Sequence, residues 1–164
     1  MKIFRRILAI SIMALATFPA IAQDKADPRV KEALDSIGIK YSVNTSNNYK
    51  VVYSMDKDKD RSQLAFIVSE TVNYRNLEVR EVWSVAAVMT EYPGQDVIQK
   101  LMAMNSTTKI GAWAIEEADD GKFWVLYTVK VPAALSPKEL ADIVYFVAEV
   151  SDELEVELVG DDEY

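Results

Sequence analysis

The chain contains neither cysteine nor histidine, and this absence restricts its fold and its chemistry more than any motif does. Without cysteine no disulfide can staple the fold, so stability must come from a packed apolar core. Hydrophobic residues make up 50% of the chain, which makes such a core feasible. A Ser-His-Asp triad, a thiol nucleophile and a His- or Cys-ligated metal are all excluded. We therefore expect no cofactor, no metal site and no catalytic residues.

Residues 1–22 have the pattern of a secretory signal peptide. A start with three basic residues is followed by an apolar run over residues 7–18 and by a small-x-small cleavage site at residues 20–22. The apolar run is shorter than the roughly 20 residues of a membrane-spanning helix. We expect the mature chain to begin at Gln23, to be periplasmic or secreted, and not to insert stably in a membrane.

The rest of the chain has the length of one domain, expected over residues 23–159, with an acidic tail at 160–164. The formal net charge of the whole chain is −8. It becomes −11 when the three basic residues of the signal are removed. Nucleic acid and anionic membrane surfaces are therefore poor partners.

Hydrophobic periodicity predicts an α+β domain. Helices are expected over residues 28–37, 95–104 and 137–154, and strands over residues 39–43, 49–55, 63–72, 77–89, 109–117 and 122–131. The element order is α-β-β-β-(β)-α-β-β-α. We expect a twisted antiparallel sheet of five or six strands, with the second and third helices on one face and the first helix near an edge.

Local signals mark the ends of two of these helices. Asp27 is expected to cap the first helix, with Pro28 at its first position and Gly38 just beyond its end. Ser136 and Glu139 have the spacing of a capping box at the start of the last helix.

The long strand at 77–89 has an apolar face at period two, with Glu81 as its one misfit. Glu81 is expected to mark a bulge or a rim position. The expected face consists of Leu77, Val79, Trp83, Val85, Ala87 and Met89.

The hairpin formed by the last two strands is predicted to be apolar on both faces. A two-residue loop, centred either on Asp119-Asp120 or on Asp120-Gly121, would place four large side chains on one face. These are the candidate interaction surface: Trp113, Ile115, Trp124 and Leu126. One layer of helices covers only one face of a sheet. The first helix, a loop or the twist of the sheet could cover this surface, or a second protomer or client protein could bind there.

Three further patterns are interpreted as structural. Asp56, Asp58 and Asp60 have the opening spacing of a calcium loop, but Arg61 stands where the loop needs Gly and Ile67 where it needs the closing Glu. No specific calcium site is expected there.

The carboxylates at 116–120 are expected to be turn and solubility residues, because consecutive strand residues point to opposite faces. Trp113 and Trp124 could stack on a flat ligand such as a sugar, but packing is the commoner role of Trp in a sheet.

Three segments carry a family resemblance: residues 101–105 read Leu-Met-Ala-Met-Asn, 111–115 read Gly-Ala-Trp-Ala-Ile and 125–129 read Val-Leu-Tyr-Thr-Val. With the element order, they resemble the YbjN family, also called bacterial sensory transduction regulators, whose fold is similar to that of type III secretion chaperones. The likeness is clearest over residues 97–158. In that family a helix ends in a Leu-rich segment followed by Asn, as at Leu101 and Asn105. A Gly-containing strand then pairs with an apolar strand before the final helix.

The resemblance implies a non-enzymatic, often dimeric α+β protein associated with protein binding or regulation. The export signal departs from this pattern, because secretion chaperones hold their clients in the cytoplasm. We therefore expect an exported protein-binding or regulatory module whose partner is another protein or a second copy. A periplasmic small-ligand binder, with Trp113, Trp124 or Tyr127 lining a pocket between sheet and helices, is the alternative. A carboxylate-based hydrolase ranks last.

Overall fold

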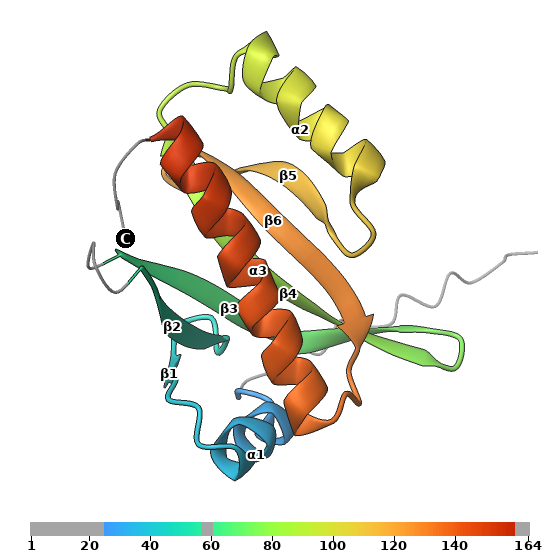
Figure 1. The fold of residues 1–164 in the computed structure, drawn as a ribbon. Coiled ribbons are helices and arrows are strands. Elements are labelled where there is room, and N and C mark those ends of the chain that lie inside the picture. Colours follow the sequence, from blue (N-terminus) through green and yellow to red (C-terminus); the bar gives the residue numbers. More distant parts are fainter. Residues whose placement is uncertain (1–24, 57–60, 160–164) are drawn as a thin grey trace, which may run out of the picture.

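The computed structural model describes residues 25–56 and 61–159, which form three helices and a six-stranded antiparallel sheet (Figure 1). The strands lie in the order β1-β2-β3-β4-β6-β5. The helices are α1 (Pro28–Ser36), α2 (Gln95–Thr107) and α3 (Pro137–Leu158), and the strands are β1 (Ser42–Val43), β2 (Tyr49–Asp56), β3 (Arg61–Tyr74), β4 (Leu77–Met89), β5 (Ala112–Glu117) and β6 (Phe123–Pro132). The predicted α+β class and element order are confirmed. The predicted signal peptide, the acidic tail, Asp58 and Asp60 lie outside the described residues.

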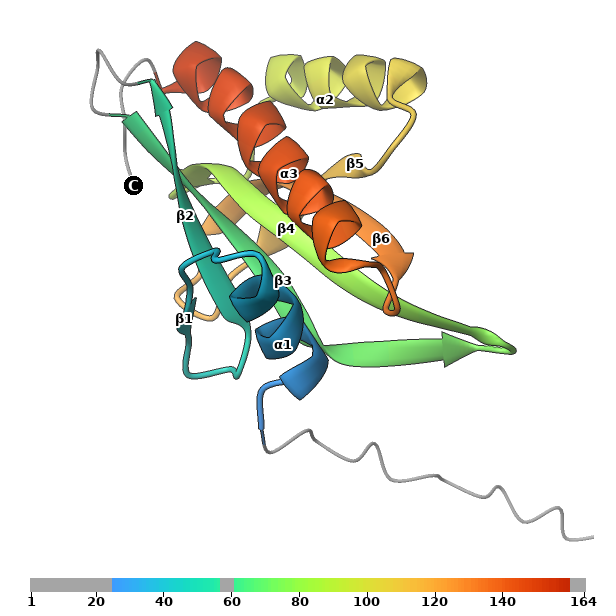
Figure 2. The same cartoon turned by 60° about the horizontal axis from the view of Figure 1, so that its bottom comes forward.

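The helices lie on one face of the sheet, which we call the helix face (Figures 1 and 2). The long helix α3 crosses β2, β3, β4 and β6, α2 packs against β5 at one edge, and α1 contacts α3. On the opposite face, which we call the open face, none of the described helices lies. The sheet is therefore covered on one side only by the part of the chain that the structure describes.

The helix ends follow the local signals. The side chain of Asp27 accepts a hydrogen bond from the Arg29 backbone N–H at the start of α1. Ser136 and Glu139 form both bonds of a capping box at the start of α3. These bonds satisfy backbone donors that the first turn of a helix leaves free.

The hydrophobic core lies between α3 and the helix face. Its fully buried members come from adjacent strands and from α3, and include Ala65, Ile67, Val82, Val125, Val144 and Val147. Because these side chains alternate along each strand, the residues between them face the opposite side. The apolar residues on that opposite side therefore cannot contact α3.

Two irregularities break the register of the sheet. Between Ile67 and Thr71 the pairing of β3 with β4 shifts, and this bulge lies opposite Glu81. A bulge was one of the two expected explanations of Glu81, the other being a rim position, and the extra residues are in β3. A second shift, between Val85 and Ala87, moves Ala87 and Met89 to the helix face, where both join the core. The predicted single face from Leu77 to Met89 is wrong in this last part, because a bulge inverts the side-chain alternation.

Helix α2 is attached to the edge of the sheet by Asn105. Its side chain accepts from the Trp113 backbone N–H at 2.7 Å and donates to the Trp113 carbonyl oxygen at 3.1 Å. An edge strand exposes such backbone groups, and Asn105 satisfies both as a neighbouring strand would. Asn105 thus fixes α2 to β5, and the helix continues for two residues beyond it, to Thr107, so it is longer than the predicted 95–104.

Candidate functional site

The β5–β6 hairpin closes with a three-residue loop instead of the predicted two-residue loop. Ala118 donates to the Lys122 carbonyl oxygen at 2.8 Å, which leaves Asp119, Asp120 and Gly121 in the loop. Gly121 adopts a positive φ of 78°, as three-residue hairpin loops require near their end. One extra loop residue shifts the pairing by one position and turns one strand over relative to the other.

The four predicted interaction residues therefore do not share a face. Trp113 pairs with Tyr127 and Ile115 with Val125 on the helix face. Trp113 is 5% exposed and belongs to the core. Trp124 and Leu126 pair with Glu116 and Ala114 on the open face. The prediction that these side chains form one surface is wrong, and only Trp124 and Leu126 remain candidates.

The open face carries an apolar surface that extends across the sheet. One row contains the pairs Val52–Leu64 and Val85–Leu126, and continues to Ala114. Val52 is 56% exposed. Leu126 is buried, yet it lies outside the core cluster beneath α3. The open face therefore has its own apolar layer, separate from the core.

Three aromatic rings form a stack at the centre of this layer. The ring centroids of Phe66 and Trp83 are 4.2 Å apart, and those of Trp83 and Trp124 are 5.9 Å apart. All three side chains are partly exposed. They line an apolar hollow of about 160 Å³, completed by Gln63, Leu64, Val85 and Val88.

The stack limits what this hollow can bind. A flat ligand such as a sugar ring needs a free aromatic face, and the central ring, that of Trp83, is already stacked against both Phe66 and Trp124. The hollow is also smaller than ordinary small-molecule pockets, which have about 300–1,000 Å³. The arrangement instead presents ring edges and aliphatic groups, which suit contact with other apolar side chains.

One end of the open face is acidic. Trp124 also lines a hollow of about 400 Å³ with Glu117, Asp119 and Asp120. Asp120 is paired with Lys122 at 3.2 Å and accepts from the Lys122 backbone N–H. A hydrogen bond from that backbone and from the Lys122 side chain lowers the pKa of Asp120. Asp120 therefore stabilises the loop, as predicted for this segment.

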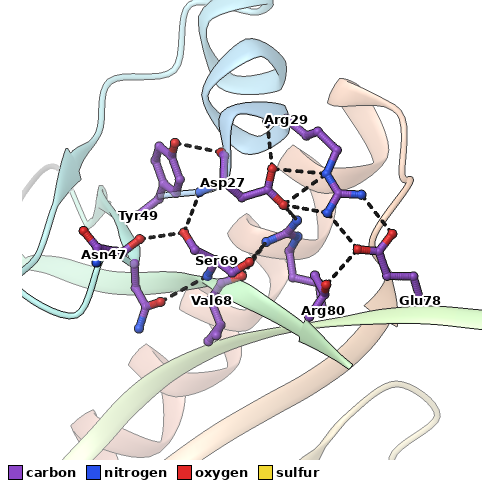
Figure 3. A network of polar contacts seen from close by, with 10 residues as sticks. Asp27, Arg29, Asn47, Tyr49, Val68, Ser69, Glu78 and Arg80 are labelled. Atoms are coloured by element: carbon purple, nitrogen blue, oxygen red, sulfur yellow. Dashed lines mark hydrogen bonds and ion pairs between the residues drawn. The ribbon is translucent and has the colours of Figure 1, made fainter. Parts of the chain in front are cut away.

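A buried ionic network lies on the other side of the sheet, at the start of α1 (Figure 3). Arg80 and Asp27 are each 2% exposed and form an ion pair. Arg80 also donates to the carbonyl oxygens of Val68 and Ser69, at 2.5 and 3.2 Å. These carbonyls belong to the β3 bulge, where the ladder no longer supplies donors. Arg80 thus links the bulge to the first helix.

Arg29 extends this network to Glu78. It donates to both Asp27 and Glu78 at 2.7 Å. Burial alone would raise the pKa of Asp27, but the hydrogen bonds from Arg29 and Arg80 hold it at about 2. The hydrogen bond from Arg29, with a second from Thr71, lowers the pKa of Glu78 to about 2. Two carboxylates held ionised by arginine are poor proton acceptors, so the network anchors α1 and offers no general base.

Sequence reasoning missed Phe66 and Arg80. Phe66 alternates with buried residues of β3, but only the register places it beside Trp83. Arg80 alternates along β4 with Val82 and Ser84 and so faces the core with them. A charged residue at a core-facing position indicates a buried ion pair, and this could have been recognised from the sequence. Its partner Asp27 lies 53 positions away, and no local pattern identifies that pair.

Two general features bear on the kind of site. None of the described helices is long and apolar enough to span a membrane. Among the same residues, no group of three or more acidic side chains is close enough together to hold a metal ion.

Comparison with known proteins identifies the fold. No family model and no curated protein matches the sequence. The structure is similar to the crystal structure of YbjN from E. coli, a proposed transcription regulator, with a TM-score of 0.53 and 13% identity. The match covers 81% of this chain and 90% of that chain. The predicted YbjN-like fold is confirmed, and at this identity the likeness concerns the fold alone.

Proposed function

We propose that this protein is an exported, non-catalytic module that binds another protein through its open face. The observation that carries the proposal is the aromatic stack of Phe66, Trp83 and Trp124 on a sheet face that no described helix covers. Apolar patches of this kind on folded domains often mark protein interfaces, and aromatic residues dominate the binding energy of such interfaces.

The alternative, a small-ligand binder with a pocket between sheet and helices, has weaker support. Two of its expected wall residues, Trp113 and Tyr127, are 5% and 1% exposed and pack edge to face in the core. The hollow between α2 and β5 has about 230 Å³ and is lined mainly by apolar side chains such as Ile98 and Leu101. The Asn105 amide in its lining is already bonded to the Trp113 backbone, so it is not free to orient a ligand as the polar groups of a typical binding pocket do.

A non-catalytic role is supported by how the acidic side chains of the network are used. Asp27 and Glu78 accept hydrogen bonds from arginines, and both are held ionised well below neutral pH. A hydrolase with two carboxylates needs one of them to retain a proton at working pH.

DNA binding is not proposed, although the similar YbjN structure is described as a proposed transcription regulator. The present chain has a net charge of −8. DNA-binding proteins neutralise phosphates with clustered Lys and Arg, so an acidic chain repels the duplex.

Two measurements test the proposal. The intact mass of the protein recovered from the cell envelope should correspond to residues 23–164, because the signal peptide is cleaved on export. Crosslinking in the native envelope followed by capture should recover a defined protein partner. Recovery of the uncleaved chain from the cytoplasm would contradict export, and recovery of no partner would contradict protein binding.

A further inference from the structure

One edge of the sheet is formed by β5, which lies beside α2 (Figure 1). Within residues 25–56 and 61–159, β5 pairs with β6 alone, so no further strand covers its outer edge. The end of this edge near the C-terminus of α2 is occupied, because the Asn105 side chain bonds both the N–H and the carbonyl oxygen of Trp113. Asn105 thus takes the place that a peptide group of a neighbouring strand would fill.

The bonds of Asn105 also show which other residues of β5 direct their backbone groups outward. Alternate residues of an antiparallel strand send both the N–H and the C=O to the same side. Trp113 sends both away from β6, so Ile115 and Glu117 do the same. The Ala118 N–H, of the opposite parity, bonds back across the hairpin to the Lys122 carbonyl oxygen. Beyond Asn105, this edge therefore presents two donors and two acceptors that no described residue pairs.

The hollow between α2 and β5 lies along the same edge. Tyr92, Ile98 and Met102 line one side of it and Ile115 the other. Tyr92 is 60% and Met102 65% exposed, so the apolar wall is open to an incoming chain. A strand added to β5 would place every second side chain on the side of Ile115, and so in this hollow. The edge therefore offers backbone pairing and apolar contact to one extended segment.

The end of the edge away from Asn105 is acidic. Glu116, Glu117 and Asp119 are exposed there. Lys122, the cation of the same hairpin end, is already paired with Asp120 at 3.2 Å. A segment with a basic residue at this end would complement the charge of the edge.

A second copy of this chain fits the edge poorly. Two β5 strands paired about a two-fold axis at Ile115 would need the backbone groups of Trp113, which Asn105 already bonds. An axis at Glu116 or at Glu117 would place the two copies of that carboxylate directly opposite each other, and like charges in that position destabilise a strand pair. The charge and the hydrogen bonds of the edge thus favour a different chain.

We propose that the outer edge of β5 binds an extended segment of another protein by strand addition. Apolar side chains at alternate positions of the segment lie in the hollow against α2, and a basic residue lies beside Glu117. Main-chain hydrogen bonds and side-chain pockets share the recognition in this mode of binding. The site is separate from the open face, so the inference goes beyond the proposed function.

A synthetic peptide tests the proposal. The probe has alternating valine and threonine, a lysine at each end and a fluorescent label, and its binding to residues 23–164 is followed by fluorescence anisotropy. We expect saturable binding. Two further peptides carry N-methyl groups on all valine amides or on all threonine amides. Only one of the two should bind more weakly, by about tenfold or more, because an added strand turns every second amide toward β5. No saturable binding up to the solubility limit of the probe, or equal effects of the two methylations, would overturn strand addition.

Variants of Glu117 test the edge itself. Glu117→Pro removes an outward N–H and leaves the β5–β6 ladder intact, because that N–H points away from β6. Glu117→Ser is the matched control, since it also removes the carboxylate but keeps the donor. The probe should bind Glu117→Pro about fivefold more weakly than Glu117→Ser, as loss of one hydrogen bond predicts. Thermal unfolding checks that both variants keep the fold, and equal binding by the two folded variants would contradict backbone pairing at this edge.

A second pair of variants separates this site from the open face and does not depend on proline. Met102→Asp places a charge in the wall of the hollow and should weaken probe binding at least about tenfold. Val52→Asp, at a position 56% exposed on the open face, should leave probe binding unchanged and should weaken capture of the open-face partner. Probe binding that is lost with Val52→Asp but kept with Met102→Asp would overturn the β5 site while leaving the proposed function standing.

Discussion

The rings of Trp83 and Trp124 lie 5.9 Å apart, stacked at 28°, on the face of the sheet opposite α3. They come from β4 and β6, which are adjacent strands. Their contact belongs to the apolar layer of the open face, which is separate from the hydrophobic core beneath α3. This separation between a complete core and a second apolar layer leads to the following predictions.

Trp124→Ala should weaken binding at the open face by about 2 kcal/mol or more, as loss of an aromatic hot spot does. Its cost to folding should be smaller than that of Trp113→Ala, which removes a core residue of the same hairpin and should cost about 3–5 kcal/mol. Urea unfolding and partner capture on the two variants measure both effects. Equal destabilisation by the two changes would show that the open face is part of the folding core.

Arg80→Met should destabilise the fold by about 3–5 kcal/mol, because it removes the buried charge partner of the Asp27 carboxylate and leaves the carbonyl oxygens of the β3 bulge without their donor. Arg29→Met is the control. The Arg29 side chain is 49% exposed, so water can replace its contacts and the loss should be about 1 kcal/mol. Denaturant unfolding of both variants measures the difference, and similar losses would contradict the structural role of Arg80.

The network predicts a loss of stability in acid. The pKa of Asp27 is lowered from 3.8 to about 2 and that of Glu78 from 4.5 to about 2. A lowered pKa means that the folded state favours the ionised carboxylate, so the contribution is complete above about pH 4.5 and is lost as the pH falls toward 2. For Asp27 this amounts to roughly 2 kcal/mol.

Asp27→Asn isolates that contribution. The variant should be less stable at neutral pH, because Arg80 loses its charge partner. Its stability should fall less steeply than that of the native chain between pH 4.5 and 2. Equal slopes in an acid titration of the unfolding free energy would contradict the assignment.

The order of elements could be predicted from local signals, because caps and periodicity act within a few residues. Ser136 and Glu139 specify the start of α3 wherever the rest of the chain lies. The faces of the β5–β6 hairpin could not be predicted in the same way, since they depend on whether the loop has two or three residues. Asp119, Asp120 and Gly121 are compatible with either length, and one residue decides which side Trp113 faces.

The residues of the candidate site could likewise be predicted only in part from the sequence. Trp124 could be identified as an aromatic residue on a strand, but its neighbours Phe66 and Trp83 are brought beside it only by the strand order. The pairing of Asp27 with Arg80 likewise joins the start of α1 to β4, 53 positions further along the chain. Long-range contacts of this kind have no local pattern in the sequence.

Gly111→Ala should strongly destabilise the chain. Gly111 has a φ of 79°, and an added Cβ would lie 2.6 Å from the Thr128 carbonyl oxygen. Gly121 has nearly the same φ, 78°, with nothing within 4 Å of an added Cβ. Gly121→Ala therefore measures the backbone strain alone, about 1–2 kcal/mol. Thermal unfolding should show a larger loss of stability for Gly111→Ala than for Gly121→Ala. Equal losses of stability would contradict the close approach of the β6 backbone to Gly111.

Site-specific photocrosslinking in the cell envelope tests the central claim most directly. A photoreactive side chain at Val52, which is 56% exposed on the open face, is compared with one at Val156, which is 42% exposed on α3, on the opposite side of the sheet. We predict a defined protein adduct from position 52, either a second copy or another protein, and none from position 156. No adduct from position 52, or the same adducts from both positions, would contradict the open face as the protein-binding surface.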